Sequence, residues 1–165
     1  GLYFKRKGIE DFVEVARRMP DVRFIWLGSI NKWLIPASIR RLVEKDHPSN
    51  VEFPGYFKGA VFQGAMSGSD AFFFPSYEET EGIVVLEALA SKQHVILRDI
   101  PVYEGWISEE SAELCHNVDE FVESLRKVLD GQVDKREAGY RVAQSRSIDD
   151  VAYQLVEAYR KVLEM

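Results

Sequence analysis

Short apolar runs alternate with amphipathic helical segments along the chain, and this alternation constrains the fold more than any other feature. The runs at 22–27, 71–74 and 94–97 are apolar at most positions and lack the strict alternation of a strand with one wet face. Strands of this kind are covered on both faces. Their alternation with helices predicts a doubly wound, Rossmann-like parallel sheet with helices on both sides.

The remaining elements follow from apolar spacing and from turn residues. Further strands are expected at 51–53 and 112–115, and helices at 9–16, 35–43, 57–66, 82–91, 118–129 and 148–163. Ser147 is typical of a helix start, because its hydroxyl can accept a hydrogen bond from a free amide. The chain opens in what reads as a strand-to-helix loop. We therefore expect residues 1–165 to be one domain of a longer protein, with its first strand missing.

Composition narrows the class of partner and the compartment. The formal net charge is -6, which argues against nucleic acid as a partner. No apolar run approaches the roughly 20 residues needed to span a bilayer. Cys115 is the only cysteine, so it is expected to be a buried, inert thiol in a reducing cytoplasm. The three histidines are too scattered to suggest a metal site.

The segment 75–90 holds the most informative motif. It follows a buried strand, turns, and enters a helix, which is where open parallel sheets bind ligands. The amides of Gly82 and Ile83 at the helix start form a natural anion site. Glu79 lies in the loop and Glu87 lies eight positions later, on the helix.

Two glutamates beside an anion site are explained if they bind hydroxyl groups. An ionised carboxylate only accepts hydrogen bonds, and vicinal sugar hydroxyls donate them. One glutamate on a ribose, one on a second sugar, and a helix start on a diphosphate together predict a nucleotide-sugar site.

The pair Glu79 and Glu87 resembles the Glu-(seven residues)-Glu motif of retaining glycosyltransferases with two Rossmann-like domains, the GT-B type of group 1. The resemblance covers nearly the whole chain as the C-terminal, donor-binding domain of that family. Within the family, the segments 6–12, 75–90 and 99–103 are most similar to bacterial 1,2-diacylglycerol glucosyltransferases, which make membrane glycolipids from UDP-glucose.

The resemblance implies a role for each motif residue. Glu79 would contact the donor sugar as the catalytic glutamate, and Glu87 would hold the ribose hydroxyls. The backbone of Gly82, Ile83 and Val84 would bind the diphosphate.

The family's basic loop aligns with the start of the chain, where Lys7 matches the phosphate-binding lysine. Leu2 stands where an arginine is usual, so Lys5 or Arg6 is expected to supply the second positive charge. Glu81 stands where a phenylalanine is common.

The resemblance also implies partners. The donor is expected to be a UDP-sugar, UDP-glucose in the first place with UDP-galactose as the open alternative, and the turn that begins at Tyr56 is expected near the uracil. The acceptor is expected to be a lipid, diacylglycerol, held by an N-terminal domain of the same protein at the inner face of the cell membrane. No metal or other cofactor is expected, and the chain alone is expected to be inactive.

Other interpretations stay open at this level. Glu87 alone could be a first-turn acid that complements the helix dipole, and Lys7 an exposed loop lysine. A regulatory receiver domain lacks the required acidic pair, and a dehydrogenase lacks the Gly-x-Gly-x-x-Gly fingerprint. A glycosyltransferase with a different acceptor also remains possible.

Overall fold

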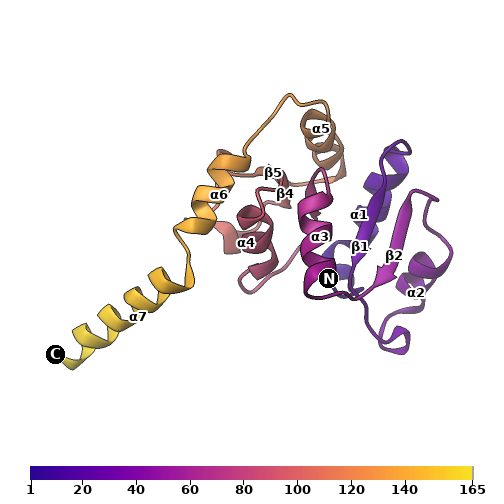
Figure 1. Ribbon diagram of the computed structural model, residues 1–165. Coiled ribbons are helices and arrows are strands. Elements are labelled where there is room, and N and C mark those ends of the chain that lie inside the picture. Colours follow the sequence, from indigo (N-terminus) through magenta and orange to yellow (C-terminus); the bar gives the residue numbers. More distant parts are fainter. Residues whose placement is uncertain (165) are drawn as a thin grey trace.

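The structure is a computed structural model that describes residues 1–164, and it combines five strands with seven α-helices and three 3₁₀ turns (Figure 1). The strands are β1 (Phe24–Leu27), β2 (Val51–Gly55), β3 (Phe72–Phe74), β4 (Val95–Arg98) and β5 (Glu113–Cys115). The helices are α1 (Ile9–Arg18), α2 (Ala37–Glu44), α3 (Ala60–Gly68), α4 (Ile83–Ala90), α5 (Val118–Leu129), α6 (Arg136–Gln144) and α7 (Ile148–Leu163).

All strand pairs are parallel, which confirms the predicted fold class. β1 pairs with β2, and β3, β4 and β5 follow one another in a second ladder. The sequence predicted one sheet, whereas no ladder joins β1 to β3 in the described chain. Aromatic side chains meet there instead: Phe24 contacts Phe73 with ring centroids 6.3 Å apart, and Phe12 of α1 stacks on Phe73 at 5.5 Å.

Helices cover both faces, as the apolar strands predict. Ile96 of β4 packs into a core shared with α1, α2 and α5. Its neighbours Val95 and Leu97 point to the opposite face, into a second core with α3 and α4. Because successive strand residues alternate in direction, one buried strand serves both cores.

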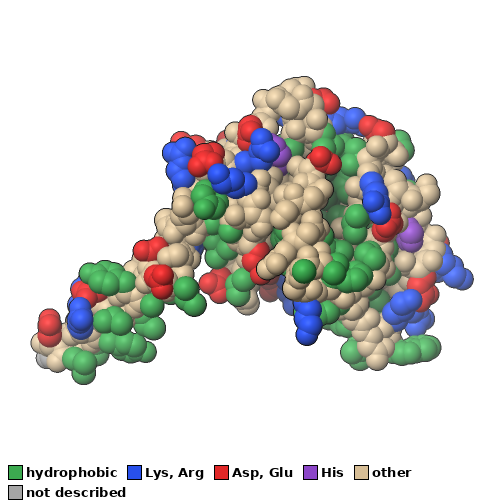
Figure 2. Space-filling model, viewed as in Figure 1, with side chains coloured by type: hydrophobic (Ala, Val, Ile, Leu, Met, Phe, Trp, Pro, Cys, Tyr) green, Lys and Arg blue, Asp and Glu red, His purple; other side chains and the backbone are tan. Residues whose placement is uncertain are grey.

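The final helix α7 extends away from the body of the molecule (Figure 1). Ser147 caps it by accepting a hydrogen bond from the Asp150 amide at 3.2 Å, which confirms the predicted start. Its apolar side chains are exposed along its length (Figure 2), including Tyr159 at 61% and Leu163 at 86%. Within residues 1–164, no helix has the length and apolar character needed to cross a membrane.

The third predicted helix lies two to three residues later in the chain than expected, at Ala60–Gly68, and Cys115 behaves as predicted. The helix predicted at 57–66 begins at Ala60, because Gly59 has φ +60° and does not continue a right-handed helix. The preceding turn stays a loop and lines a pocket. Cys115 is buried, and burial raises the pKa of its thiol to about 11.

Candidate functional site

The basic turn near the start of the chain packs directly on the loop that follows β3. Residues Lys5–Lys7 form a 3₁₀ turn that ends at Gly8, whose φ of +75° is left-handed. A Cβ atom at Gly8 would lie 2.2 Å from the carbonyl oxygen of Pro75, so only glycine fits. The Tyr77 amide donates to the carbonyl of Arg6 at 2.8 Å. The two loops therefore form one unit.

Lys7 and Glu79 form an ion pair inside this unit. Lys7 Nζ lies 2.5 Å from Glu79 Oε1, and only 15% and 11% of the two side chains are exposed. Ser76 Oγ donates to the same carboxylate oxygen at 2.7 Å. Within residues 1–164 no hydrogen bond reaches Oε2 of Glu79, so this oxygen is available to accept one from a ligand.

The start of α4 lies next to this pair in the chain. Gly82 caps the helix with φ +82°, and a Cβ there would meet the Tyr103 ring at 3.1 Å. The first amides of a helix have no partner within it, so they can bind an anion. Tyr103 is buried, and its hydroxyl has no hydrogen-bond partner among the described residues. Burial, and then the charge of Glu79, raises the pKa of this phenol.

Glu87, in the second half of α4, lines a pocket of about 560 Å³. Its side chain is exposed and makes no ion pair or hydrogen bond within residues 1–164. The turn after β2 provides the opposite wall, with Tyr56 exposed at 69%. The pocket is lined by Tyr56, Phe57, Lys58, Gly59, Phe62, Gln63, Met66, Glu87, Ala90 and Ser91.

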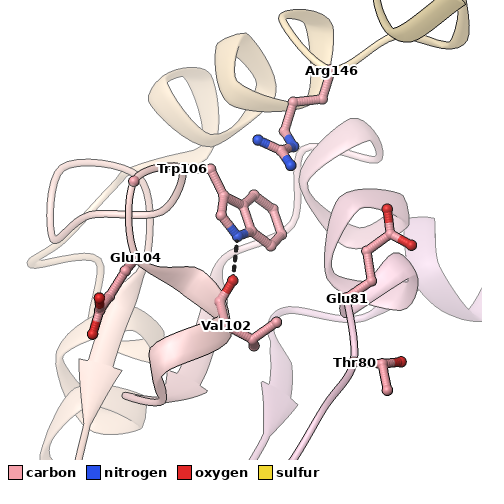
Figure 3. A pocket seen from close by; sticks show the side chains of 7 residues that line it. Thr80, Glu81, Val102, Glu104, Trp106 and Arg146 are labelled. Carbon is pink, nitrogen blue, oxygen red and sulfur yellow. Dashed lines mark hydrogen bonds between the residues drawn. The ribbon is translucent and has the colours of Figure 1, made fainter. Parts of the chain in front are cut away.

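A second pocket, of about 310 Å³, lies beside the loop that carries Glu79 (Figure 3). Glu81 faces it, together with Trp106 and Arg146. The Arg146 guanidinium lies 4.7 Å from the centroid of the Trp106 ring. The Trp106 indole donates to the carbonyl of Val102 at 2.7 Å. Glu81, which replaces the family's usual phenylalanine, thus points into a polar pocket.

The structure brings together some of the predicted site residues and separates others. Lys7 lies against Glu79, and Glu87 shares a pocket with the Tyr56 turn. Lys5 pairs with Glu10 at 3.2 Å instead of joining Lys7. What each of these side chains would bind stays a prediction.

The sequence reasoning missed a buried cluster centred on Arg98, at the end of β4. Arg98 is 6% exposed and pairs with Asp11 of α1. The signal was present, because a charged residue that ends an apolar strand needs a partner when it is buried. Asp11 lies within the segment 6–12 on which the resemblance rests.

Within residues 1–164, no group of three or more His, Cys, Asp or Glu side chains is placed to hold a metal ion.

Comparison with known proteins identifies two curated relatives, one that matches the whole chain and one that matches 61% of it. A diacylglycerol glucosyltransferase of Acholeplasma laidlawii, described as processive and α-specific, is 51% identical over the whole chain, which spans 50% of its length. An alpha-galactosylglucosyldiacylglycerol synthase of Streptococcus pneumoniae is 30% identical over 61% of the chain and 27% of its own length. The chain thus spans about half or less of the curated relatives it matches.

A structural comparison and a family match agree with these relatives. A sucrose-phosphate synthase from Thermosynechococcus elongatus superimposes with a TM-score of 0.84 at 23% identity, covering 99% of this chain and 44% of that structure. Residues 1–146 match the family described as glycosyl transferases group 1. The predicted resemblance is confirmed, and the chain belongs to the group 1 glycosyl transferases.

Proposed function

We propose that this chain binds UDP-glucose as the donor of a retaining glycosyl transfer. One observation carries the proposal: along the chain, the start of α4 lies between Glu79, which pairs with Lys7, and Glu87, which lines a pocket. A nucleotide sugar also has three parts in a row, a nucleoside, a diphosphate and a sugar. The chain order of Glu79, the α4 start and Glu87 matches the order of sugar, diphosphate and nucleoside along the ligand.

The nucleoside is assigned to the pocket that Glu87 lines. The exposed, unpaired carboxylate can accept hydrogen bonds from both ribose hydroxyls. Tyr56 and Phe57 offer aromatic surface for a base on the opposite wall. The volume of about 560 Å³ is within the range of small-ligand sites.

The diphosphate is assigned to the backbone of Gly82, Ile83 and Val84 and to Lys7. Helix amides and a lysine together neutralise negative charge on a leaving group. We therefore propose that transfer needs no metal or other cofactor. Glu79 would contact the donor sugar, since its free Oε2 can accept a hydroxyl hydrogen.

The acceptor is proposed to be a lipid, diacylglycerol. One curated relative is named a diacylglycerol glucosyltransferase, and the other is named an alpha-galactosylglucosyldiacylglycerol synthase. The first relative is about twice the length of this chain, which supports a separate N-terminal domain that binds the acceptor. The proposed place of action is the cytoplasmic face of the cell membrane, with no nucleic acid partner.

Calorimetric titration of the protein with UDP, GDP and ADP tests the donor assignment. UDP should bind at least about tenfold more tightly than the purine nucleotides, because a difference of roughly 1.4 kcal/mol follows from one or two base contacts. Equal binding of all three would contradict a uridine pocket. Titration with UDP-glucose and UDP-galactose then separates the two donor sugars, and tighter binding of UDP-galactose would overturn the glucose assignment.

A further inference from the structure

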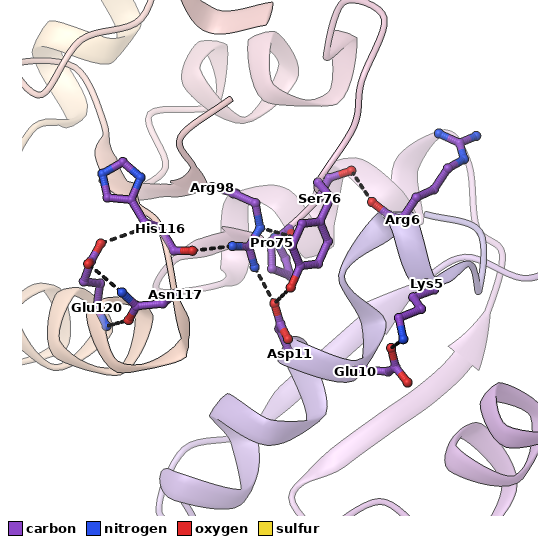
Figure 4. Close-up of polar contacts among 11 residues, drawn as sticks. Lys5, Arg6, Glu10, Asp11, Pro75, Ser76, Arg98, His116, Asn117 and Glu120 are labelled. Carbon is purple, nitrogen blue, oxygen red and sulfur yellow. Dashed lines mark hydrogen bonds and ion pairs between the residues drawn. The ribbon is translucent and has the colours of Figure 1, made fainter. Parts of the chain in front are cut away.

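A buried arginine joins three parts of the molecule behind the Lys7–Glu79 pair. Arg98 Nε donates to the Pro75 carbonyl at 3.1 Å, and Nη1 donates to the His116 carbonyl at 2.6 Å. Nη2 donates to the carboxylate of Asp11 (Figure 4). The guanidinium lies 3.8 Å from the centroid of the Tyr77 ring. Each of the three guanidinium nitrogens therefore donates a hydrogen bond.

Tyr77 is the third member of the cluster, and it connects back to Asp11. The Tyr77 hydroxyl donates to the same Asp11 oxygen at 2.6 Å, and this hydrogen bond raises the pKa of the phenol. Asp11 therefore accepts from both Arg98 and Tyr77. Arg98 is 6% exposed, and burying its charge without such partners would destabilise the folded state. Its planar set of donors suits the fixed carbonyl and carboxylate positions around it.

The partners of Arg98 lie next to the residues of the proposed donor site. Asp11 is four positions after Lys7, on the helix that begins directly after the basic turn. Pro75 is four positions before Glu79, in the loop that Tyr77 ties to the basic turn. A shift of Arg98 would therefore move the two loops that carry Lys7 and Glu79 relative to one another.

We propose that Arg98, with Asp11 and Tyr77, is a positioning clamp for the Lys7–Glu79 side of the donor site. The clamp fixes the distance between the basic turn and the Glu79 loop, and so prepares both side chains for the diphosphate and sugar. Arg98 acts through these loops, because its own guanidinium is buried and engaged. This inference rests on the proposed function.

A purely structural role would have a different signature. If Arg98 only stabilised the fold, its replacement would lower the melting temperature and reduce the fraction of active protein, without changing the relative affinities of UDP and uridine. If the clamp positions Lys7 and Glu79, UDP binding weakens and uridine binding does not. Uridine uses only the Glu87 pocket, which shares no residue with the clamp.

The experiment compares Arg98→Lys and Tyr77→Phe with the wild-type protein by calorimetry with UDP and with uridine. Arg98→Lys keeps the charge and loses the planar set of three donors, so UDP affinity should fall about 2- to 10-fold, at most the loss expected when Lys7 itself is removed. Uridine affinity should stay within about twofold. Tyr77→Phe removes one hydroxyl from a half-exposed side chain, so it tests the clamp even if Arg98→Lys does not fold; it should show a smaller loss in the same direction.

A matched control and a double variant sharpen the result. Lys135→Met breaks another partly buried ion pair, to Glu113 on β5, outside the site; it should lower stability and leave the ratio of UDP to uridine affinity unchanged. In a Lys7→Ala background, Arg98→Lys should cause little further loss of UDP affinity, because coupled residues are not additive.

The experiment distinguishes a failure of the proposed function from a failure of the clamp. A wild-type protein that does not bind UDP would overturn the proposed function, and the clamp with it. A wild-type protein that binds UDP, with variants that lose UDP and uridine equally or lose neither, would overturn the clamp alone. Full additivity with Lys7→Ala would also overturn it.

Discussion

The two sides of the candidate donor site are built differently. On one side, Lys7 and Glu79 are 15% and 11% exposed, paired with each other, and held by Ser76. On the other side, Glu87 and Tyr56 line an open pocket, and the side chain of Glu87 is bonded to no other residue within 1–164. One side is assembled before the ligand arrives, and the other offers free groups that only a ligand can engage.

The difference predicts how each side contributes to binding. The carboxylate of Glu87 would give its full hydrogen bonds to a ligand, since it has none to break within residues 1–164. Lys7 must share its charge between Glu79 and an incoming diphosphate, so its net contribution is smaller. In the proposed assignment, pre-assembly limits the gain from Lys7 but fixes where the phosphates and the sugar would lie.

The largest expected effect concerns the reaction. In the proposed assignment both sides of the site bind only the donor, so the 165-residue chain alone should not transfer sugar to diacylglycerol vesicles. Positioning of donor and acceptor supplies about 7–11 kcal/mol in such reactions, so activity should lie at least ~10⁵-fold below that of a two-domain enzyme. Radiolabelled UDP-glucose measures the transfer, with the full-length Acholeplasma laidlawii relative as positive control. Comparable turnover by the chain alone would mean that an acceptor site lies within these residues.

The next effect tests the open side. Glu87→Gln should weaken UDP binding by about 10- to 100-fold, because charge-assisted hydrogen bonds to ribose are worth about 1.5–3 kcal/mol each. The melting temperature should not change, because Glu87 has no side-chain partner to lose within residues 1–164. Glu81→Gln, another exposed glutamate of the same motif, is the control and should leave UDP affinity unchanged. Undiminished affinity in a folded Glu87→Gln protein would remove ribose binding from its role.

A smaller effect is expected on the assembled side. Lys7→Ala should weaken UDP binding by about tenfold, in the range of a single partly compensated charge contact. Uridine, which has no phosphate, should bind as before. Titration of both ligands against the wild-type protein decides between the two possibilities, because an equal loss for uridine would assign Lys7 to loop structure.

The smallest effect separates the sugar from the nucleotide. Glu79→Ala should weaken UDP-glucose binding by about threefold to tenfold, roughly one hydrogen bond. UDP binding should be unchanged or tighter, because the variant releases Lys7 from its ion pair. Competition titration of the two ligands gives the ratio, and equal losses for both would end the division of roles proposed here.

Local patterns predicted most of the elements of the fold. The apolar runs at 71–74 and 94–97 became β3 and β4 within one residue at each end, and helices cover both faces. These features depend on burial of neighbouring residues, which periodicity reports directly. The split into two ladders was not predictable, because strand pairing depends on which distant segments meet.

The candidate site was predictable in its motif and not in its contacts. The spacing of Glu79 and Glu87 indicated the family, and the comparisons confirm it. The contacts of Lys7 with Glu79, and of Arg98 with Asp11, join residues more than 70 positions apart in the chain. The spacing of apolar residues carries no information about contacts between segments so far apart in the chain. They follow from the tertiary packing of α1 against the ends of β3 and β4.

Amide chemical-shift mapping tests the central claim most directly, since it locates the ligand on both sides of the site at once. UDP should shift the amides of Lys7, Gly82, Ile83 and Val84, together with those of Tyr56 and Glu87. Uridine should shift only the Tyr56 and Glu87 group. Shifts confined to the pocket of Glu81, Trp106 and Arg146, or a uridine pattern that includes Lys7 and Gly82, would contradict a donor site divided in this way.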